Sequence, residues 1–223
     1  IIESILKEYN IPDDFKYLAV IESGLANVVS PAGAAGFWQI LKGTAREHGL
    51  EVNSAIDERY NLEKATVVAC EYLQDAYNKF GSWTMAAASY NMGKNGAGRE
   101  IEMQASNNYY NLHLNSETSR YIFRIIAVKE IMKNPKKYGF MLREKDLYSM
   151  PNYKIIEVDS TISDLSIFAR SQNVNYKLLK QFNPWLRTTS LPDKSRRRYL
   201  LKIPIDTDLL VFDDIQVTID SLK

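Results

Sequence analysis

The sequence predicts an α+β protein, with a mainly helical domain over residues 1–150 and a smaller β-α-α-β domain over residues 151–223. Up to about residue 150, apolar residues recur three and four positions apart, which is the spacing of an amphipathic helix. After Pro151 the pattern changes, because two β-type runs, "YKIIEVD" and "RYLLKIP", flank two short helical patterns. These two observations place the domain boundary at Pro151.

Start and stop signals define the expected helices. Asn61 caps the start of a long helix that Gly81 ends, and Pro135 ends the last helix of the first domain. The segments "GKNGAG" and "ASNNYYNLHLN" are interpreted as glycine-rich turns and as a loop with exposed aromatic rings. Helices are expected at residues 2–9, 13–23, 43–48, 62–80, 83–91 and 118–134, and in the second domain at 162–171 and 175–182.

Composition and charge exclude several classes of protein. Apolar residues make up 45% and charged residues 25% of the chain, as in an ordinary globular protein. The net charge of +1 gives no electrostatic reason to expect binding to nucleic acid or to a membrane. The single cysteine, Cys70, excludes an internal disulfide, and its apolar helical context indicates a buried thiol.

One carboxylate lies on an otherwise apolar helix face. Pro12 and Asp13 favour a helix start, with Asp13 accepting free backbone N–H groups, and Gly24 favours its end. Glu22 therefore lies in the last turn, where burial and the helix dipole both raise the pKa of a carboxyl group, as a general acid requires. A solvated glutamate at the rim of the stripe fits the spacing equally well. The stripe contains Glu22 and three apolar residues, Phe15, Leu18 and Ala19.

Two neighbouring segments favour a sugar site around this carboxylate. The small residues of "SPAGAAGFWQI" allow the backbone to approach a ligand closely, and they precede a Phe-Trp pair and Gln39. Tyr90 and Asn91 lie at the end of a small-residue helix. Aromatic faces, amides and one protonatable carboxylate are typical of a site that binds and cleaves a sugar.

The order of these motifs resembles a known family, the lytic transglycosylases of the soluble type with a lysozyme-like catalytic domain, and most closely the membrane-bound D type. The resemblance implies cleavage of the β-1,4 bond between N-acetylmuramic acid and N-acetylglucosamine in peptidoglycan, without water and with a 1,6-anhydro product. The matching blocks are "IESGL" (21–25), "SPAGAAGFWQI" (30–40), "GTAREHGL" (43–50), "ASYNMG" (88–93) and "SETSRYIFRIIAVKEIMKNPKKYG" (116–139).

The resemblance also implies the roles of single residues. Glu22 matches the catalytic glutamate, which acts first as an acid and then as a base while the substrate's own 2-acetamido group stabilises C1. The substrate-binding residues that match the family motifs are Ser23, Gln39, Tyr90, Asn91, Glu117 and Tyr121. Phe37 is also expected to bind substrate, although it and Trp38 stand where the family often has leucine and methionine.

Structural roles remain open for these residues. The two tyrosines are also consistent with core aromatics whose hydroxyl is bonded, and the two amides with loop or cap residues. Only one of Phe37 and Trp38 is expected to face a sugar. Glu117 precedes a helix that begins near Thr118, so a role at the helix N-terminus is at least as well supported as one in substrate binding.

The C-terminal domain resembles a divergent LysM module, a β-α-α-β fold that binds N-acetylglucosamine chains. The matching features are the opening strand with Val158 and Asp159, the run from Ile162 to Ala169, and "LLKQFNPWL" before "LKIP". Where many LysM modules have Gly-Asp-Thr-Leu, this chain has Val-Asp-Ser-Thr-Ile. A packing or spacer role therefore remains open beside sugar binding.

From these observations we expect an enzyme that uses no cofactor. We also expect no metal site, because His48 and His113 have no second ligand at metal-binding spacing. The expected partners are peptidoglycan glycan strands in the periplasm or cell envelope, with no nucleic acid and a monomeric chain. Any association with the outer membrane would come from segments outside this sequence. Two alternatives are a goose-type-like muramidase, which would deliver water, and a noncatalytic peptidoglycan-binding protein.

Overall fold

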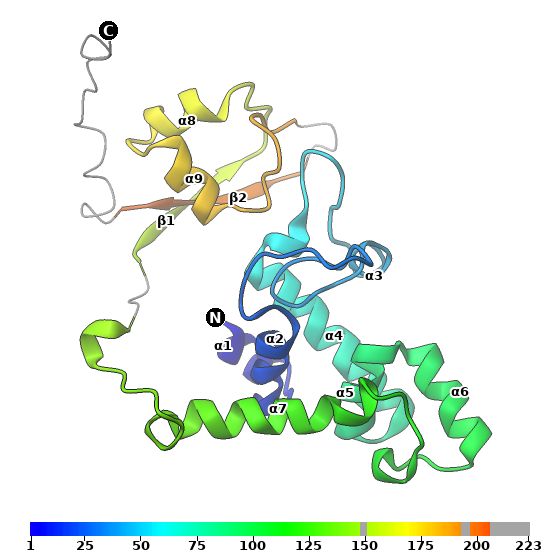
Figure 1. Cartoon of the computed structure of the whole chain (residues 1–223). Helices are drawn as coiled ribbons and strands as arrows, with labels where there is room; N and C mark the ends of the chain where they lie inside the picture. The colour runs from blue at the N-terminus through cyan, green and yellow to red at the C-terminus, as the bar shows by residue number, and fades with distance from the viewer. Residues whose placement is uncertain (148–150, 193–196, 206–223) are drawn as a thin grey trace, which may run out of the picture. The chain divides into compact units, whose positions relative to one another are not determined.

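The structure is a computed structural model that describes residues 1–147, 151–192 and 197–205, and it confirms the α+β class. The chain divides into two compact units (Figure 1). The first unit contains Ile1–Val52 and Glu58–Glu144, and the second contains Asn53–Asp57 and the chain from Lys145 onward.

Helices build the first unit, and most of them occupy the predicted positions. Asn61 caps the longest one by accepting a hydrogen bond from the backbone N–H of Lys64, and Gly81 ends it in the left-handed conformation, as the sequence predicts. The elements are α1 (Ile2–Glu8), η1 (Asp13–Phe15), α2 (Lys16–Ser23), α3 (Lys42–Glu47), η2 (Glu58–Tyr60), α4 (Leu62–Phe80), α5 (Trp83–Met92), α6 (Lys94–Gln104), η3 (Tyr109–Asn111), α7 (Thr118–Lys133) and η4 (Pro135–Tyr138), followed by η5 (Glu144–Asp146).

The predicted cap of the second helix is wrong. Asp13 begins the 3₁₀ turn η1, and no side chain caps either that turn or α2. The carboxylate of Asp13 instead pairs with the Lys16 ammonium at 2.7 Å. A short 3₁₀ entry leaves fewer backbone N–H groups aligned for an aspartate to accept, so an ion pair takes its place.

The segment interpreted as glycine-rich turns is helical. Gly96 and Gly98 lie inside α6, where each glycine costs roughly 1 kcal/mol relative to alanine. The helix is anchored by Ala97, which is fully buried, and by Ile101, which packs against the core, while α6 as a whole lies against α5. Tertiary packing therefore overrides the weak local propensity.

The tyrosine-rich segment after α6 is only partly exposed. Tyr110 is exposed as predicted, but Tyr109 is buried, and its hydroxyl donates to the backbone carbonyls of Thr118 and Ser119 at 2.8 Å each. Identical neighbours in the sequence thus have opposite environments, because a 3₁₀ turn directs consecutive side chains to different faces.

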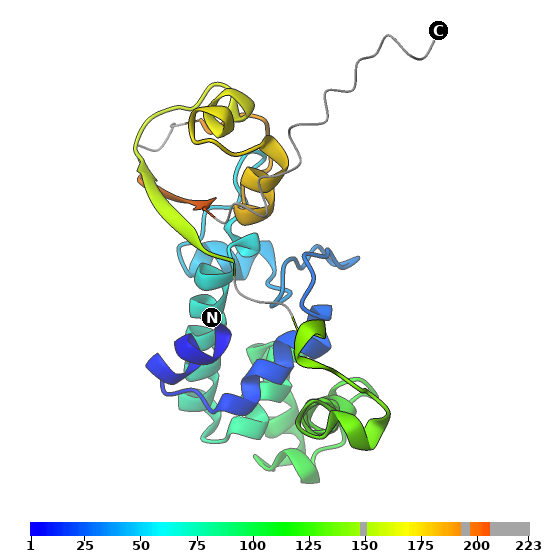
Figure 2. The same ribbon diagram turned by 90° about the vertical axis from the view of Figure 1, so that its left-hand side faces the viewer.

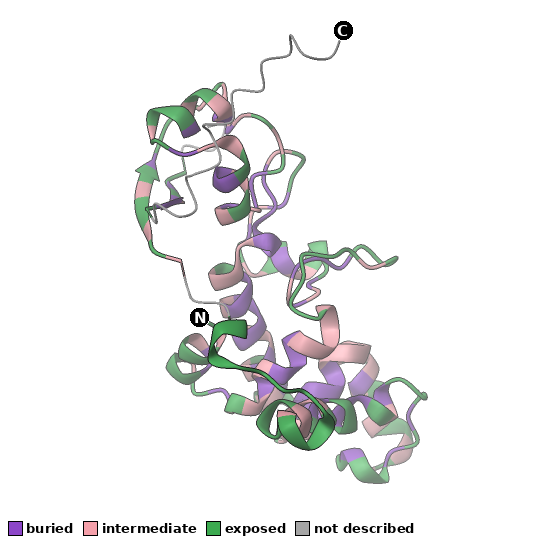
Figure 3. Cartoon of the chain, turned by 60° about the vertical axis from the view of Figure 1, so that its left-hand side comes forward, coloured by how far each residue is buried: buried purple, intermediate pink, exposed green. Residues whose placement is uncertain are grey.

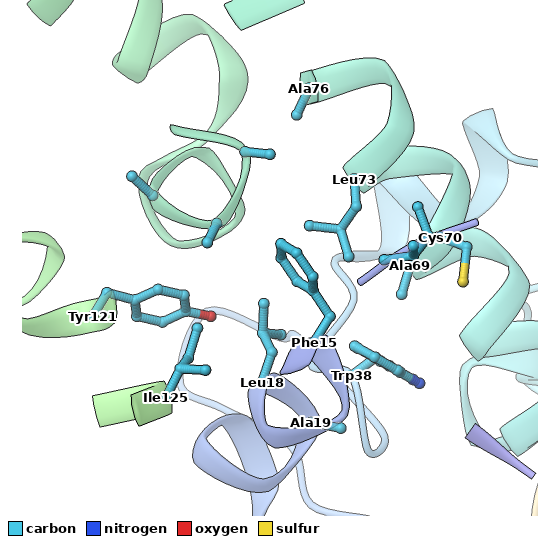
Figure 4. Packing of buried hydrophobic residues seen from close by; sticks show 14 of the residues in the cluster. Phe15, Leu18, Ala19, Trp38, Ala69, Cys70, Leu73, Ala76, Tyr121 and Ile125 are labelled. Atoms are coloured by element: carbon cyan, nitrogen blue, oxygen red, sulfur yellow. The ribbon is translucent and has the colours of Figure 1, made fainter. Parts of the chain in front are cut away.

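The core of the first unit lies where α2, α4, α5 and α7 meet (Figure 4). Phe15 and Leu18 reach it from η1 and α2, Leu73 and Cys70 from α4, and Ile125 from α7. Buried positions line the inner faces of these helices, and exposed positions face outward (Figure 3). Burial raises the pKa of the Cys70 thiol to about 12, so this cysteine is a packing residue, as predicted.

The second unit has the predicted β-α-α-β order (Figure 2). Its strands pair antiparallel, with Tyr153 opposite Pro204 and Val158 opposite Tyr199. The buried side chain of Asn183 accepts from the Lys202 N–H and donates to its carbonyl, each at 2.8 Å, and so ties the loop after the helices to the second strand. The elements are β1 (Tyr153–Val158), α8 (Leu165–Ser171), α9 (Tyr176–Phe182) and β2 (Tyr199–Pro204).

One short segment of the second unit comes from far earlier in the sequence. Ile56 is fully buried and forms a β-bridge with Leu186. Two further backbone hydrogen bonds extend the contact, from the Asp57 N–H to the Trp185 carbonyl at 2.9 Å and from the Arg187 N–H to the Ala55 carbonyl at 2.8 Å. The chain thus contributes residues 53–57 to the β-α-α-β unit.

Candidate active site

Glu22 lies in the last turn of α2, as the sequence predicts. Gly24 ends the helix in the left-handed conformation, with its N–H bonded to the Val20 carbonyl at 2.8 Å. The apolar residues of the same stripe are buried beneath the carboxylate, and Glu22 itself is half-buried. The core therefore fixes its backbone while part of the side chain remains accessible.

Tyr121 provides the direct contact to this carboxylate. Its hydroxyl donates a hydrogen bond to Glu22 Oε1, joining α7 to α2 across 99 positions of sequence. The ring is almost completely buried, and it points from α7 into the core beside Ile125 and Leu18 (Figure 4). The tyrosine is thus a core aromatic whose polar end reaches the acid, so its structural and site roles coincide.

The surroundings of Glu22 raise its pKa above the ordinary value of a glutamate. Burial is the largest cause, because it removes the charged form from water, and the nearby carboxylate of Glu117 acts in the same direction. The Tyr121 hydrogen bond and the positive charge of Arg124 oppose this shift. The net direction agrees with the prediction from the sequence.

Tyr90 lies near the same carboxylate, but its hydroxyl is bonded elsewhere. It donates to the Trp38 carbonyl at 2.8 Å, and its ring meets Tyr72 edge-on at 5.3 Å between centroids. Burial, together with the charge of Glu22, holds the pKa of Tyr90 well above its usual value. This tyrosine is therefore a neutral donor that anchors the loop before α3.

That loop, residues 30–40, closes on itself and on the end of α2. Ala35 forms β-bridges with Val29 and Ile40, and Ser23 Oγ donates to the Phe37 carbonyl at 2.8 Å. The side-chain amide of Gln39 donates to the carbonyls of Gly36 at 2.8 Å and Val28 at 3.0 Å. In these contacts Ser23 and Gln39 stabilise the loop backbone.

Gly36 is the glycine of this loop that close packing requires. It has a φ of +78°, and a Cβ there would lie 2.2 Å from the backbone oxygen of Arg59. The Arg59 guanidinium in turn donates to the carbonyls of Gly33 and Ile40. The close approach that the small residues predict is therefore, at this position, an approach to the protein's own backbone.

Phe37 and Trp38 have different environments. Trp38 is fully buried and donates from Nε1 to Thr66 Oγ1 at 2.9 Å, so it is a core residue. Phe37 is half-buried and packs only partly against the core. Of the two, Phe37 is the one that retains exposed surface for a ligand.

Asn91 and Glu117 form a connected polar group at the start of α7. The Asn91 amide donates to Glu117 Oε1 at 3.0 Å, and the Thr118 hydroxyl donates to Asn91 Oδ1 at 2.7 Å. The Glu117 carboxylate only accepts, so it selects the NH₂ end of the Asn91 amide, and the buried Thr118 hydroxyl donates to the other end. Glu117 occupies the N-cap position of α7 but makes no capping hydrogen bond.

Sequence reasoning missed Arg124 and Thr118. Arg124 Nη2 donates to the Ile21 carbonyl at 3.2 Å, one residue before Glu22. Arg124 follows Tyr121 by three positions, one helical turn, and that spacing was the available signal. Thr118 is adjacent to a predicted site residue, but only the fold reveals its contact with Asn91.

Within the described ranges, no cluster of three or more histidine, cysteine, aspartate or glutamate residues could hold a metal ion. His48 instead pairs through Nδ1 with Glu71 Oε2 at 2.8 Å. In the same ranges no helix has the length and apolar character needed to cross a membrane.

Sequence profiles of two families match the chain. Residues 1–113 match the Transglycosylase SLT domain, and residues 154–207 match the soluble lytic transglycosylase C-terminal LysM-like domain. The first match covers Glu22, Tyr90 and Asn91 but ends before α7, so the partners of Glu22 on that helix lie beyond it.

Individual relatives have low sequence identity to this chain. Membrane-bound lytic murein transglycosylase D of Escherichia coli is 28% identical over 192 residues, which are 83% of this chain and 42% of the relative. The chain thus spans less than half the length of that curated relative. Two solved structures, the soluble lytic transglycosylase of Escherichia coli and an inactive variant of Slt from Pseudomonas aeruginosa, each have a TM-score of 0.48, with 22% and 16% identity. The two matches cover 64% and 66% of this chain, respectively, and each covers 26% of the solved chain.

Proposed function

Because this chain belongs to the Transglycosylase SLT domain family, we propose that it is a peptidoglycan lytic transglycosylase with Glu22 as its acid and base. The substrate is a glycan strand of alternating N-acetylmuramic acid and N-acetylglucosamine, cut at the β-1,4 bond that follows N-acetylmuramic acid. The product carries a 1,6-anhydro end, because no water enters the reaction.

The observation that supports this proposal most strongly is the contact between Glu22 and Tyr121. The carboxyl group is half-buried, has a raised pKa and accepts a hydrogen bond from a buried tyrosine on another helix. A carboxyl group with these properties remains protonated to higher pH than an exposed one and is held in a fixed orientation. Both properties are required of a general acid.

The proposed reaction has two proton transfers. Glu22 first gives its proton to the glycosidic oxygen as the bond from that oxygen to C1 breaks, while the 2-acetamido oxygen of the substrate stabilises C1. The C6 hydroxyl of the same sugar then attacks C1, and its proton passes to the Glu22 carboxylate. The enzyme returns to its starting state, and the two products together contain the atoms of the substrate.

The remaining residues position these groups in the proposal. Tyr121 orients the carboxyl group, and Ser23, Gln39 and Tyr90 hold the loop of residues 30–40 beside it. Phe37 offers a partly exposed ring for a sugar face. We further propose that the LysM-like unit binds N-acetylglucosamine, that the site of action is the cell envelope, and that the chain acts as a monomer.

Replacing Glu22→Gln tests the proposal. The amide cannot donate a proton in the acid's place, so cleavage of purified peptidoglycan should fall by at least about 100-fold, whereas glycan binding should persist. Glu102→Gln, at an exposed position on α6, is the matched control and should leave turnover unchanged. Full turnover by the Glu22 variant would refute the assignment.

Mass spectrometry of the products separates the alternatives. A transglycosylase releases an anhydro product, whereas a muramidase releases one heavier by one water. A muramidase deserves this test because a second carboxylate, Glu117, acts electrostatically on Glu22, and many glycosidases use two carboxylates. A noncatalytic binding protein would release neither product.

A further inference from the structure

The face of α7 that meets Glu22 carries polar and charged side chains that the proposed chemistry leaves without a role. Three residues on this face, Glu117, Tyr121 and Arg124, follow at intervals of four and three positions. Glu117 has a helical backbone conformation although it precedes the helix, so the spacing places all three side chains on one stripe. The stripe has a carboxylate at one end, a hydroxyl in the middle and a guanidinium at the other end.

We propose that this stripe, which we call the α7 charge stripe, sets how readily Glu22 releases its proton and takes it back. This inference rests on the proposed function of Glu22. It assigns Glu117 and Arg124 as positioning residues that act through Glu22, in opposite directions, and it accounts for Glu117 without a sugar contact.

Separate hydrogen bonds hold each residue of the α7 charge stripe. Tyr121 donates directly to Glu22, and Arg124 donates to the Ile21 carbonyl at 3.2 Å. A cation at this point also compensates the negative end of the α2 dipole. Glu117 accepts from the Asn91 amide at 3.0 Å. The Arg124 side chain is thus tied to the end of α2 and the Glu117 side chain to the end of α5.

The buried hydroxyl of Thr118 supports the acidic end of the stripe. Its bond to Asn91 Oδ1, at 2.7 Å, leaves the NH₂ end of that amide facing Glu117. Were the amide reversed, its oxygen would face the Glu117 carboxylate and repel it. Asn91 therefore orients the Glu117 carboxylate, whose negative charge acts on Glu22.

The two charges have opposite effects on the pKa of Glu22. Glu117 raises it, because a second negative charge disfavours ionisation, and Arg124 lowers it. The other titratable groups that act on Glu22 in the described part of the chain are Tyr121, on the same helix, and Tyr90, on α5. Both tyrosines have pKa values well above their usual range, so they stay neutral. Burial and the Tyr121 hydrogen bond are the two largest causes of the pKa of Glu22, and the charges of Arg124 and Glu117 adjust it in opposite directions.

A residue that must act first as an acid and then as a base needs such a balance. Without Arg124, burial and Glu117 would both hold the proton on Glu22 and weaken the base of the second step. Without Glu117, Glu22 would lose its proton at a lower pH and could no longer act as the acid of the first step. The α7 charge stripe therefore serves both proton transfers.

The test is the pH dependence of kcat/KM for cleavage of purified peptidoglycan glycan strands. Activity falls on the alkaline side as Glu22 loses its proton, so this limb reports the pKa of the acid. Glu117→Gln should move the limb to lower pH, and Arg124→Gln should move it to higher pH. The limb of Arg124→Lys should lie near that of the wild type, because the positive charge is kept. The limb of the variant that carries both Glu117→Gln and Arg124→Gln should lie between those of the two single variants.

Matched controls remove the same charges elsewhere. Glu102→Gln on α6 and Lys133→Gln at the end of α7 are at exposed positions and should leave the limb in place. If both stripe variants lower the rate but keep the wild-type limb, the stripe is only structural and the inference is wrong.

A second measurement does not depend on turnover. A titration of the Glu22 side-chain carboxyl by carbon-13 NMR should show the same two opposite shifts in Glu117→Gln and Arg124→Gln. If the wild type cleaves no glycan while these shifts appear, the proposed function fails but the electrostatic inference stands. If the wild type cleaves glycan and the shifts are absent, the inference alone fails.

Discussion

Glu22 lies where the protein destabilises its charged form. Its pKa is raised mainly by burial, and the hydrogen bond from Tyr121 offsets this only in part. A group with a raised pKa contributes stability below its unfolded-state pKa and loses that contribution as the pH rises through its folded-state pKa. The same property that suits a general acid should therefore lower the free energy of unfolding at neutral and alkaline pH.

This argument predicts a pH-dependent gain of stability in Glu22→Gln. At pH 4 the Glu22 carboxyl group is mostly protonated in the folded wild type, because its pKa is raised, so the two proteins should melt at similar temperatures. As the pH rises toward 8 the wild type should lose stability relative to the variant, because only the wild type gains a poorly solvated charge. Thermal melts followed by circular dichroism at both pH values measure the difference, and a constant difference would contradict the assignment of a raised pKa.

Single residues differed in how far the sequence could predict them. Glu22 was predictable because its helix face and its glycine stop are both local signals. The resemblance of motifs predicted Tyr121 as a substrate-binding residue, but its hydrogen bond to Glu22, 99 positions away, appears only in the fold. Arg124 carried no local signal of its relation to Ile21, because that contact exists only once α2 and α7 pack together.

At the scale of elements, capping residues predicted helix ends correctly, whereas glycines inside a helix led to a wrong prediction of turns. The long helix α4 has an asparagine cap and a glycine stop, and both function as predicted. In α6, by contrast, Gly96 and Gly98 suggested turns, whereas buried Ala97 holds the segment helical. Local propensity is a weak guide wherever one or two buried side chains supply the larger free energy.

The loop of residues 30–40 shows which glycines a structure requires. Gly33 and Gly36 have nearly equal φ values, +79° and +78°, but a Cβ at Gly33 would meet nothing within 4 Å, whereas one at Gly36 would meet the Arg59 backbone at 2.2 Å. Gly33→Ala should therefore cost about 1–2 kcal/mol from backbone strain alone. Gly36→Ala adds a clash with backbone atoms and should cost about 3 kcal/mol or more.

Urea unfolding of the two alanine variants measures this difference. Gly36→Ala should also reduce peptidoglycan cleavage, because the loop carries the Phe37 carbonyl that accepts from Ser23 beside Glu22. Gly33→Ala is the matched control for the effect of a positive φ. Equal losses of stability in the two variants would show that contact with the Arg59 backbone is unimportant.

At the scale of the whole molecule, the chain does not divide at a single point. Residues 53–57 belong to the second unit, although they lie between two helical segments of the first. No sequence pattern indicates this, because "NSAID" resembles an ordinary polar loop and contains a single large apolar residue. The β-bridge from Ile56 to Leu186 and the backbone hydrogen bonds of Ala55 and Asp57 reveal where the segment belongs.

The fully buried side chain of Ile56 allows a direct test of this division. Ile56→Ala should destabilise the second unit by about 2–5 kcal/mol, the usual cost of removing a large buried aliphatic side chain. Hydrogen exchange measured by mass spectrometry should then show faster exchange in β1 and β2, as it should for Leu179→Ala in α9. Leu73→Ala, in the core of the first unit, should instead speed exchange in α4. If Ile56→Ala speeds exchange in α4 and leaves the strands protected, residues 53–57 belong energetically to the helical unit.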